Sequence, residues 1–587
     1  MSFSKLNPIA LFVASAACLG AYAQTPGDGV PLKAVHPGYS ISSLMPAGLT
    51  LGVSGLDFMA DGRLVVSTWG GDHKVLVPPS KKGEVYILSN IGQEDSAKVT
   101  FKKFATGLQE PLGLKVVNDT VYLSERQALA ALADKNGNGV IDSGEYRKVA
   151  AYAGGGARHE FFFGLLYKDG WFYGAHSLSL NSGASVVPQP SENRGTFVRI
   201  EKATGKTEYI AGGARETFGM GMNPDGEMFS TEVQGSYNPA CGFNQIKPGK
   251  FYGHPLVNQV PASPWDTKPY QKVAVLLPQS EIANAPGEPV YIPGGPYKGH
   301  YLYGDVTYGG IQRVFLEKIG EEYQGAVMRF SAGFNCGVSR LKFAPNGDLI
   351  VGQIGDGDGN WNEPGKKLYG LQKLKANGKT AFEMLTVRSR PKGMELEFTE
   401  PVALDADQAA KYEVKTWTYE RTSAYGGPKV PASPKALTIS KVLVDSGRKK
   451  VYLEITGLVA GEHVVHIKLK GLKSAADGAL WTTEAWYTLN AFGSGEPFSP
   501  PVALAPGVPG GPSKLVLDRT AGAMTFRIRA AGAYDLRVTD ARGVEVARFA
   551  GIGPDAKLLP LRGMMPGAYA ATLRIGGQAQ TQAFTSW

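Results

Sequence analysis

The sequence has few cysteines, few charged residues and no long apolar stretch beyond its first residues. It contains three cysteines in 587 residues, and none lies in a C-x-x-C-H motif, which excludes an attached c-type haem. Charged residues make up 19%, and the net charge of +9 is spread without a dense Lys/Arg block. This pattern favours a basic solvated surface over a nucleic-acid site. After residue 19, no stretch reaches the ~18 apolar residues of a membrane span.

Glycine and proline are abundant instead. The chain has 76 glycines and 38 prolines, and 43% of its residues are hydrophobic. This mixture indicates many turns that join short strands, with enough apolar residues for buried cores, and it excludes wholesale disorder. The length predicts several domains, since single domains usually have about 100–200 residues.

The N-terminus has the pattern of a secretory signal peptide. Lys5 supplies the positive charge, Ile9–Leu19 is apolar, and Ala21–Ala23 is an A-x-A cleavage site. We therefore predict a signal peptide over 1–23 and a periplasmic or secreted protein. Lipoprotein processing at Cys18 is an alternative, although Ser15–Ala17 lack the branched apolar residue usual at such sites.

Removal of the signal leaves Cys241 and Cys336. In an oxidising compartment these two residues form either a disulfide or two separate buried thiols, and the sequence does not decide between them.

A repeat of about 50 to 58 residues runs through the first two thirds of the chain. Each copy has a small apolar entry, a turn with Asp-Gly or a related pair, and an alternating strand. The copies are 55–67, 113–124, 164–174, 219–230 and 340–352. A turn of this kind between alternating segments predicts a hairpin with one buried face.

The last gap between copies is about twice the others, so one degenerate copy is expected between Gly253 and Phe330. The best candidates are Tyr301–Val306 and Gln312–Leu316. Small sheets cannot bury both faces alone, and stacking them around an axis does so. We therefore predict an all-β fold with a six-bladed β-propeller over 40–375.

The Asp-Gly signature ends after Leu374. Strand patterns at Lys450–Ile455 and His463–Leu469 predict a β-sandwich (Ig-like) domain over 380–492. A Gly/Pro/Ser-rich linker follows over 493–513, and a small C-terminal β-sandwich is expected over 514–587. Neither tail contains an obvious catalytic cluster.

The segment from Asp134 to Glu145 matches a twelve-residue calcium loop. Oxygen ligands and a glycine stand at the required spacing, and Val140 would contribute its backbone carbonyl. An Asn/Gly-rich turn that binds nothing is the alternative. The expected ligands are Asp134, Asn136, Asn138, Val140, Asp142 and Glu145.

Charged residues precede the repeat strands in equivalent places. His159 stands before the third, Arg215 and Glu216 before the fourth, and Arg340 opens the last copy. Equivalent positions of a propeller converge on one end of its axis, so these side chains are candidates for one pocket that takes an anionic cofactor or a polyhydroxylated substrate. The His159 imidazole is a candidate general base. A structural histidine and inter-blade salt bridges are the alternatives.

Several motifs occur in the order found in one known family. They are His159 through Lys168-Asp169-Gly170 to Tyr173, Arg215–Gly219 with Asn223–Gly226, Asn244–Pro255, and Gly304–Val306. Over residues 45–375 the chain resembles the glucose/sorbosone dehydrogenase family of soluble sugar dehydrogenases, as a divergent member.

The resemblance implies a six-bladed propeller that binds pyrroloquinoline quinone and calcium at its mouth and oxidises sugar hydroxyls. His159 matches the family's base, Arg215 matches an arginine beside the cofactor, and Arg340 is similar to another. Glu216 stands where the family has Asn. The segment 234–243 lacks the acidic residues that hold the cofactor's calcium in the family, and Arg158 replaces an acidic partner of the base.

The leading hypothesis is thus an exported quinone-dependent oxidoreductase that acts on a carbohydrate or small polyol and passes electrons to an acceptor. His159 would be the base, and Arg215, Glu216 and Arg340 would bind the cofactor. Two alternatives remain: a non-redox carbohydrate-binding or surface-interaction propeller, and a cofactor-free sugar lyase or hydrolase in which Glu160, Glu216 and His159 do acid–base work.

Overall fold

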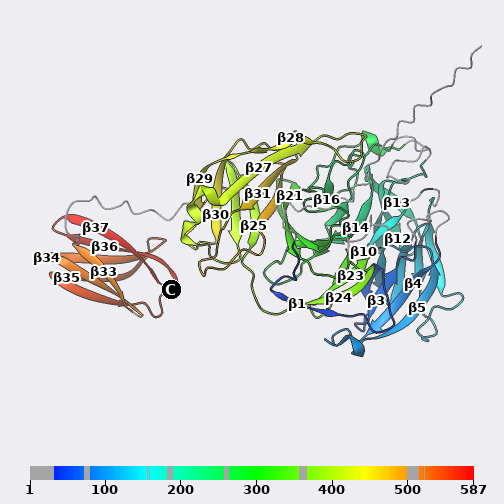
Figure 1. Cartoon of the computed structure of the whole chain (residues 1–587), viewed down its shortest axis with the longest axis horizontal. Coiled ribbons are helices and arrows are strands. Elements are labelled where there is room, and N and C mark those ends of the chain that lie inside the picture. The colour runs from blue at the N-terminus through cyan, green and yellow to red at the C-terminus, as the bar shows by residue number, and fades with distance from the viewer. Residues whose placement is uncertain are drawn as a thin grey trace, which may run out of the picture.

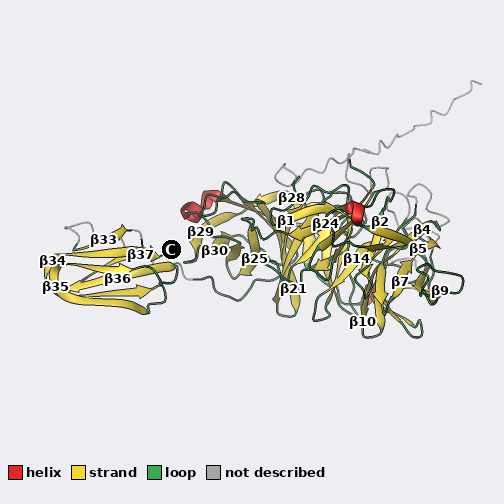
Figure 2. Cartoon of the chain, turned by 90° about the horizontal axis from the view of Figure 1, so that it is seen from below, coloured by secondary structure: helices red, strands yellow, loops and turns green. Residues whose placement is uncertain are grey.

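The computed structural model describes residues 32–71, 80–154, 157, 159–180, 190–256, 263–355, 366–498, 514–520 and 522–586. β-Strands dominate, and the short 3-10 turns that the described ranges contain include Ser96–Lys98, Trp265–Thr267, Leu404–Asp407 and Ala409–Lys411 (Figure 2). The all-β prediction is confirmed. The predicted signal peptide, the alternative lipoprotein Cys18 and Arg158 lie outside the described residues.

The strands up to Ala376 form six consecutive units of four antiparallel strands, arranged as a β-propeller (Figure 1). The first three units are β2 (Val53–Phe58), β3 (Leu64–Thr68), β4 (Gly83–Ser89) and β5 (Thr100–Leu108); β6 (Leu114–Val117), β7 (Thr120–Glu125), β8 (Ala128–Leu132) and β9 (Tyr146–Ala151); and β10 (Phe162–Lys168), β11 (Trp171–His176), β12 (Thr196–Glu201) and β13 (Thr207–Gly212).

The next two units are β14 (Thr217–Met222), β15 (Met228–Glu232), β16 (Cys241–Ile246) and β17 (Val275–Leu277); and β18 (Val290–Tyr291), β19 (Tyr301–Gly304), β20 (Ile311–Ile319) and β21 (Glu322–Ser331). The last unit combines β22 (Val338–Phe343), β23 (Leu349–Ile354) and β24 (Tyr369–Ala376) with β1 (Tyr39–Ser43). Since β1 pairs with β24, the start of the described chain closes the ring.

The repeat turns lie between the first and second strands of their units. At Asp169 and Gly170, φ is +51° and +84°, and the flanking Lys168 and Trp171 pair across the hairpin. This is the left-handed geometry that an Asp-Gly pair adopts readily. A hairpin is present at the expected degenerate copy, but β19 and β20 are the second and third strands of the fifth unit. The hairpin equivalent to the other copies is the short β18–β19 pair, so the predicted copy is displaced by one strand.

Several units have a polar side chain near the end of their second strand. This side chain accepts a backbone N–H group from the loop that precedes the first strand of the same unit. Glu125 accepts from Gln109, Ser177 from Phe161, and Gln353 from Cys336. Because these loops lie at one end of the ring, the recurring acceptor fixes the backbone that carries the candidate site residues.

The strands after Ala376 form two further sheets. One contains β25 (Met384–Arg390), β26 (Gly393–Phe398), β30 (Lys450–Thr456) and β29 (Thr438–Val444). The other contains β32 (Glu484–Leu489), β31 (His463–Leu469), β27 (Tyr412–Tyr419) and β28 (Lys429–Ala436). We call this region, 380–492, the second domain.

The second domain is continuous with the propeller. β32 pairs with β21 of the fifth unit, so that one sheet runs through both. Phe315, Ala326 and Met328 of the fifth unit belong to the same apolar core as the second domain. This shared core would have been difficult to predict, because each half has a strand pattern of its own.

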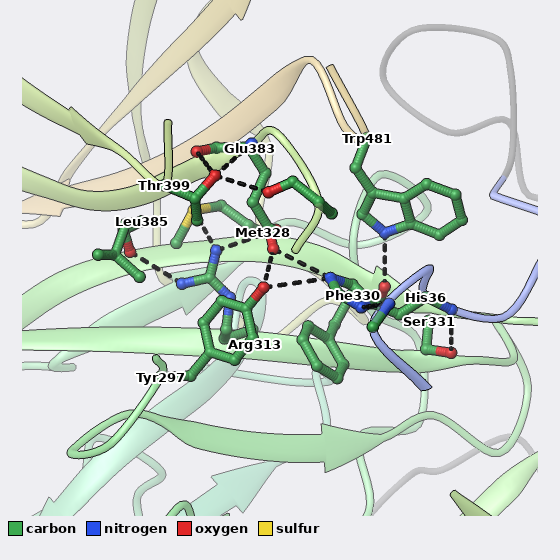
Figure 3. Close-up of polar contacts among 12 residues, drawn as sticks. His36, Tyr297, Arg313, Met328, Phe330, Ser331, Glu383, Leu385, Thr399 and Trp481 are labelled. Atoms are coloured by element: carbon green, nitrogen blue, oxygen red, sulfur yellow. Dashed lines mark hydrogen bonds and ion pairs between the residues drawn. The ribbon is translucent and has the colours of Figure 1, made fainter. Parts of the chain in front are cut away.

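A buried polar cluster also joins the two regions (Figure 3). The Glu383 carboxylate lies 3.0 Å from His36 Nε2 and 3.3 Å from Arg313 Nη2, and all three side chains are at most 1% exposed. The hydroxyl of Tyr297 donates to the same carboxylate. His36 precedes β1, Arg313 is on β20 and Glu383 precedes β25, so the cluster links the start of the chain, the fifth unit and the second domain.

The C-terminal region is a five-stranded antiparallel sheet with its own apolar core. Its strands are β33 (Leu515–Thr520), β34 (Ala523–Asp540), β35 (Glu545–Pro560), β36 (Gly567–Ile575) and β37 (Gln578–Ser586). Most of the predicted linker, 499–513, lies outside the described residues.

The cysteines are two separate buried thiols, Cys241 and Cys336. The disulfide alternative is therefore wrong. Within the described ranges, no helix is both long and apolar enough to span a membrane.

Candidate functional site

The sequence-predicted residues His159, Arg215 and Glu216 meet at one end of the propeller. His159 lies three residues before the hairpin strand β10, and Arg215 and Glu216 directly precede β14. β10 and β14 are the first strands of adjacent units and pack against each other. Residues that are about 57 positions apart in the sequence are thus brought into contact.

The contact is a hydrogen bond of 2.7 Å between His159 Nδ1 and Glu216 Oε1. The side chains of His159 and Glu216 are 12% and 5% exposed. A carboxylate at this distance holds the proton on Nδ1, so the lone pair of the neutral ring is on Nε2. The His159 backbone N–H donates to the carbonyl of Leu180, which holds the backbone of this residue.

Arg215 lies on the other side of Glu216. Its Nη1 is 3.5 Å from Glu216 Oε2, and its side chain is 1% exposed. Its Nε has no hydrogen-bond partner among the described residues. A Cβ atom at Gly235 would come within 1.9 Å of this Nε, so the guanidinium group requires glycine at that position.

Glu232, at the end of β15, positions the segment that carries Arg215 and Glu216. Its carboxylate accepts the backbone N–H groups of these two residues at 2.5 and 2.9 Å, and the Thr217 hydroxyl at 3.2 Å. Burial raises the pKa of Glu232 to about 7, although these donors oppose the shift. Glu232 was not predicted from the sequence; the signal that could have identified it is the recurring acceptor position described above.

Glu160 follows His159 but serves another purpose. Its buried carboxylate accepts the hydroxyls of Ser179 and Ser191 at 2.5 and 2.7 Å and the Ala157 N–H at 3.2 Å. These bonds join neighbouring loops of the third unit, which indicates a structural function for Glu160.

Arg340 has a different set of partners. It donates to the carbonyls of Ser339 and Leu112 at 2.8 and 2.5 Å, and its Nε is 3.9 Å from Glu288. It lines a small cavity together with aromatic residues of the ring interior, among them Phe161 and Phe218. The pairing with Glu288 of the adjacent unit corresponds to the inter-blade alternative for Arg340.

A further histidine, His254, lies beside Arg215 and belongs to the Asn244–Pro255 motif. Its Nδ1 donates to the carbonyl of Pro255 at 2.9 Å, so Nε2 accepts the Ser236 hydroxyl at 3.1 Å. Burial, with the nearby charge of Arg215, lowers the pKa of His254 to about 4. His254 is therefore neutral near pH 7 and is a structural neighbour of the site.

The predicted calcium loop lies between β8 and β9. Asp134 accepts the N–H groups of Gly137 and Gly139 at 2.8 Å each, and Asp142 accepts the side-chain amides of Asn136 and Asn138. The Glu145 carboxylate accepts the N–H groups of Lys135 and Asp142 at 2.7 and 2.9 Å.

These bonds gather the predicted ligands around one turn. Lys102 Nζ donates to the Asn138 carbonyl of the same loop. No group of three or more His, Cys, Asp or Glu side chains within the described ranges is arranged to hold a metal ion. Calcium at this loop stays a prediction.

Comparison with known proteins gives one family match, to a domain of unknown function (DUF7133) over residues 34–264. No curated protein matches the chain. The chain is also similar to several solved structures. One is described as an oxidoreductase (glucose dehydrogenase) from Thermus thermophilus. The two sequences are 18% identical, the match covers 58% of this chain and 100% of the other, and the TM-score is 0.39.

Two others are the pyrroloquinoline-quinone-bound aldose sugar dehydrogenase from Streptomyces coelicolor and a carbohydrate-active enzyme of family AA12 from Trichoderma reesei. The first has 16% identity, coverage of 58% and 99%, and a TM-score of 0.39. The second has 14% identity, coverage of 59% and 98%, and a TM-score of 0.41. Proteins of the glucose dehydrogenase type, which the motifs resemble, are thus among the similar structures.

Proposed function

We propose that this protein is an exported oxidoreductase that oxidises a hydroxyl group of a carbohydrate or small polyol. The observation that carries the proposal is the hydrogen bond of 2.7 Å between His159 Nδ1 and Glu216. It gives the site an imidazole of fixed tautomer at the end of the propeller where the family-like motifs converge.

In this reaction His159 is the general base. The substrate hydroxyl gives its proton to Nε2, and the Glu216 carboxylate stabilises the imidazolium ion that forms. Glu232 acts as a positioning residue, because it holds the backbone N–H groups of Arg215 and Glu216.

The second product of the oxidation is a hydride equivalent from the carbinol carbon, which needs an acceptor. Pyrroloquinoline quinone, when bound, would take this hydride. The residues present fit such an anionic quinone in one respect, since the buried Arg215 guanidinium has an Nε donor without a partner in the described part of the chain. Arg215 would hold one of its carboxylates.

The same residues do not provide a calcium site beside the quinone. The carboxylates of Glu160 and Glu232 are occupied by N–H and hydroxyl donors, and Glu216 is paired with His159 and Arg215. The structural calcium at the 134–145 loop is a separate proposal.

A second candidate is a cofactor-free lyase. This candidate is favoured because the site has a carboxylate–histidine pair, and its carboxylates do not form a calcium site. His159 would then remove a proton from a carbon next to a carboxylate of the sugar, and a carbon–oxygen bond would break. The product would have a carbon–carbon double bond that absorbs in the ultraviolet.

Dye reduction by the purified chain tests the first proposal. The chain is incubated with the quinone and calcium and then with a panel of sugars and polyols. We expect turnover with at least one of them, and a decrease of kcat by about 10²–10⁴ in His159→Gln. His463→Gln is the matched control, because His463 lies in the second domain and its Nδ1 donates to the carbonyl of nearby Gly461 at 3.1 Å.

If no substrate in the panel leads to dye reduction, the oxidoreductase proposal is wrong. An increase in ultraviolet absorbance without quinone or dye, which disappears in His159→Gln, would favour the lyase.

A further inference from the structure

A loop of the second domain lies against the candidate site. It connects β27 and β28 and spans residues 420–428, at the side of the second domain that faces the propeller (Figure 1). Its backbone bonds to the propeller segment 235–239: the Thr422 carbonyl accepts the Tyr237 N–H at 2.6 Å, and the Gly426 N–H donates to Gly235 at 3.1 Å. The Gly427 N–H donates to Pro239 at 3.2 Å.

Side chains fix the first end of this loop. Arg421 Nη1 donates to the Tyr237 carbonyl at 3.1 Å, and Nη2 lies 3.4 Å from Glu462. The guanidinium group also lies 4.9 Å from the centre of the Tyr270 ring. Arg421 therefore contacts both the propeller and its own domain.

The other end is fixed at Lys429. Its ammonium group pairs with Glu281 of the propeller and lies 4.1 Å from the centre of the Trp417 ring. The indole N–H of Trp486 donates to Glu281 at 2.9 Å. With both ends and the middle bonded, the loop has a defined position over the propeller.

Tyr425 is the residue of this loop that reaches the candidate site. The Arg215 guanidinium carbon is 5.4 Å from the centre of the Tyr425 ring. Arg215 is buried, whereas Tyr425 is 52% exposed. An aromatic residue that covers a site cation and is itself half exposed is suited to stack against the apolar face of a sugar ring.

We propose that the second domain completes the candidate site and that Tyr425 positions the carbohydrate ring of the substrate. The inference rests on the proposed function and adds a residue about 210 positions away from Arg215 in the sequence. The second domain thereby contributes to substrate binding as well as to stability.

The test compares Tyr425→Ala and Tyr425→Phe with the wild-type chain. Loss of the ring is expected to raise KM about tenfold for the sugar that is turned over, with kcat within about twofold, which corresponds to one lost stacking contact. Tyr425→Phe keeps the ring and is expected to retain the wild-type KM. Phe101→Ala is the control, since Phe101 is 42% exposed on the outer strand β5.

A second measurement does not depend on turnover. In Tyr425→Trp, the tryptophan emission is followed during titration with the same panel of sugars, and Phe101→Trp is the control. A saturable change in the first variant and none in the second is expected. If the wild-type chain oxidises no sugar but Tyr425→Trp responds, the proposed function fails and the binding inference holds.

An unchanged KM in Tyr425→Ala would overturn the inference even if the enzyme is active. Absence of any sugar-dependent emission change in Tyr425→Trp would overturn it as well. A lower melting temperature of Tyr425→Ala together with unchanged KM would show that the ring only covers Arg215.

Discussion

Replacement of Glu383 by alanine removes the carboxylate shared by His36, Arg313 and Tyr297. Arg313 and Glu383 are both 0% exposed, so the guanidinium would remain buried without its counterion. Burial raises the pKa of Glu383, but the charge of Arg313 outweighs this effect and holds the pKa below its ordinary value. Truncation of one partner of a buried ion pair typically costs about 3–5 kcal/mol.

The expected loss lies at the lower end of this range. Arg313 keeps hydrogen bonds to the carbonyls of Leu385 and Met384 at 2.8 and 2.6 Å, and these partly compensate its charge. We expect Glu383→Ala to lower the free energy of unfolding of the propeller and second domain by about 3 kcal/mol. Arg313→Met combined with Glu383→Leu removes both charges and is expected to restore most of this loss.

Urea unfolding followed by tryptophan fluorescence and circular dichroism measures the effect. The control is Glu84→Ala, because Glu84 pairs with Lys103 at 2.6 Å but the two side chains are 26% and 50% exposed. Such a surface pair contributes about 1 kcal/mol or less. If Glu383→Ala unfolds at the same urea concentration as Glu84→Ala, the reasoning from burial is wrong.

Three further predictions concern the site, the pH dependence and the metal loop. Glu216→Gln is expected to decrease kcat by about 10²-fold or more with an intact fold, because the amide no longer stabilises the His159 imidazolium; steady-state kinetics with matched circular dichroism spectra check this. Burial lowers the pKa of His254 from 6.5 to about 4. The contribution of the neutral His254 ring to the free energy of unfolding is therefore fully present above pH 6.5 and is lost as the pH falls towards 4. This loss amounts to about 3 kcal/mol, and His254→Asn should flatten the pH dependence of the melting temperature. Calcium at 100-fold its Kd should stabilise the chain by about 2.7 kcal/mol, and Asp134→Ala should abolish this effect in calorimetric titration and thermal unfolding.

Much of the propeller was predictable because its information is local. The Asp-Gly hairpin at Asp169 requires only that two residues adopt positive φ and that alternating residues follow. Spacing located the degenerate copy only to within one strand, because the hairpin at Tyr301 joins the second and third strands of its unit. The connection between β21 and β32 was not predictable, because strand patterns do not specify which distant strand edge is paired.

The candidate site was predictable in part. His159, Arg215 and Glu216 were chosen because they stand at equivalent repeat positions, and the structure brings them together. Arg340 was grouped with them, but it lies within β22, at the place that Gly219 has in β14, and its side chain turns to the carbonyl of Leu112 and to the ring interior. Because Arg215 precedes its strand and Arg340 lies inside its strand, the two side chains start from different places on the backbone of their units.

The sequence by itself determined the β-strand repeat, its hairpin turns and the positions of His159 and Glu216 before two adjacent strands. Only the tertiary structure decided that these two side chains hydrogen-bond, that Glu232 fixes their backbone, and that Tyr425 of the second domain covers Arg215. Turns depend on the conformational preferences of a few neighbouring residues. Contacts between distant residues depend instead on ring closure and on the sheet shared by the two domains, and no local pattern encodes them.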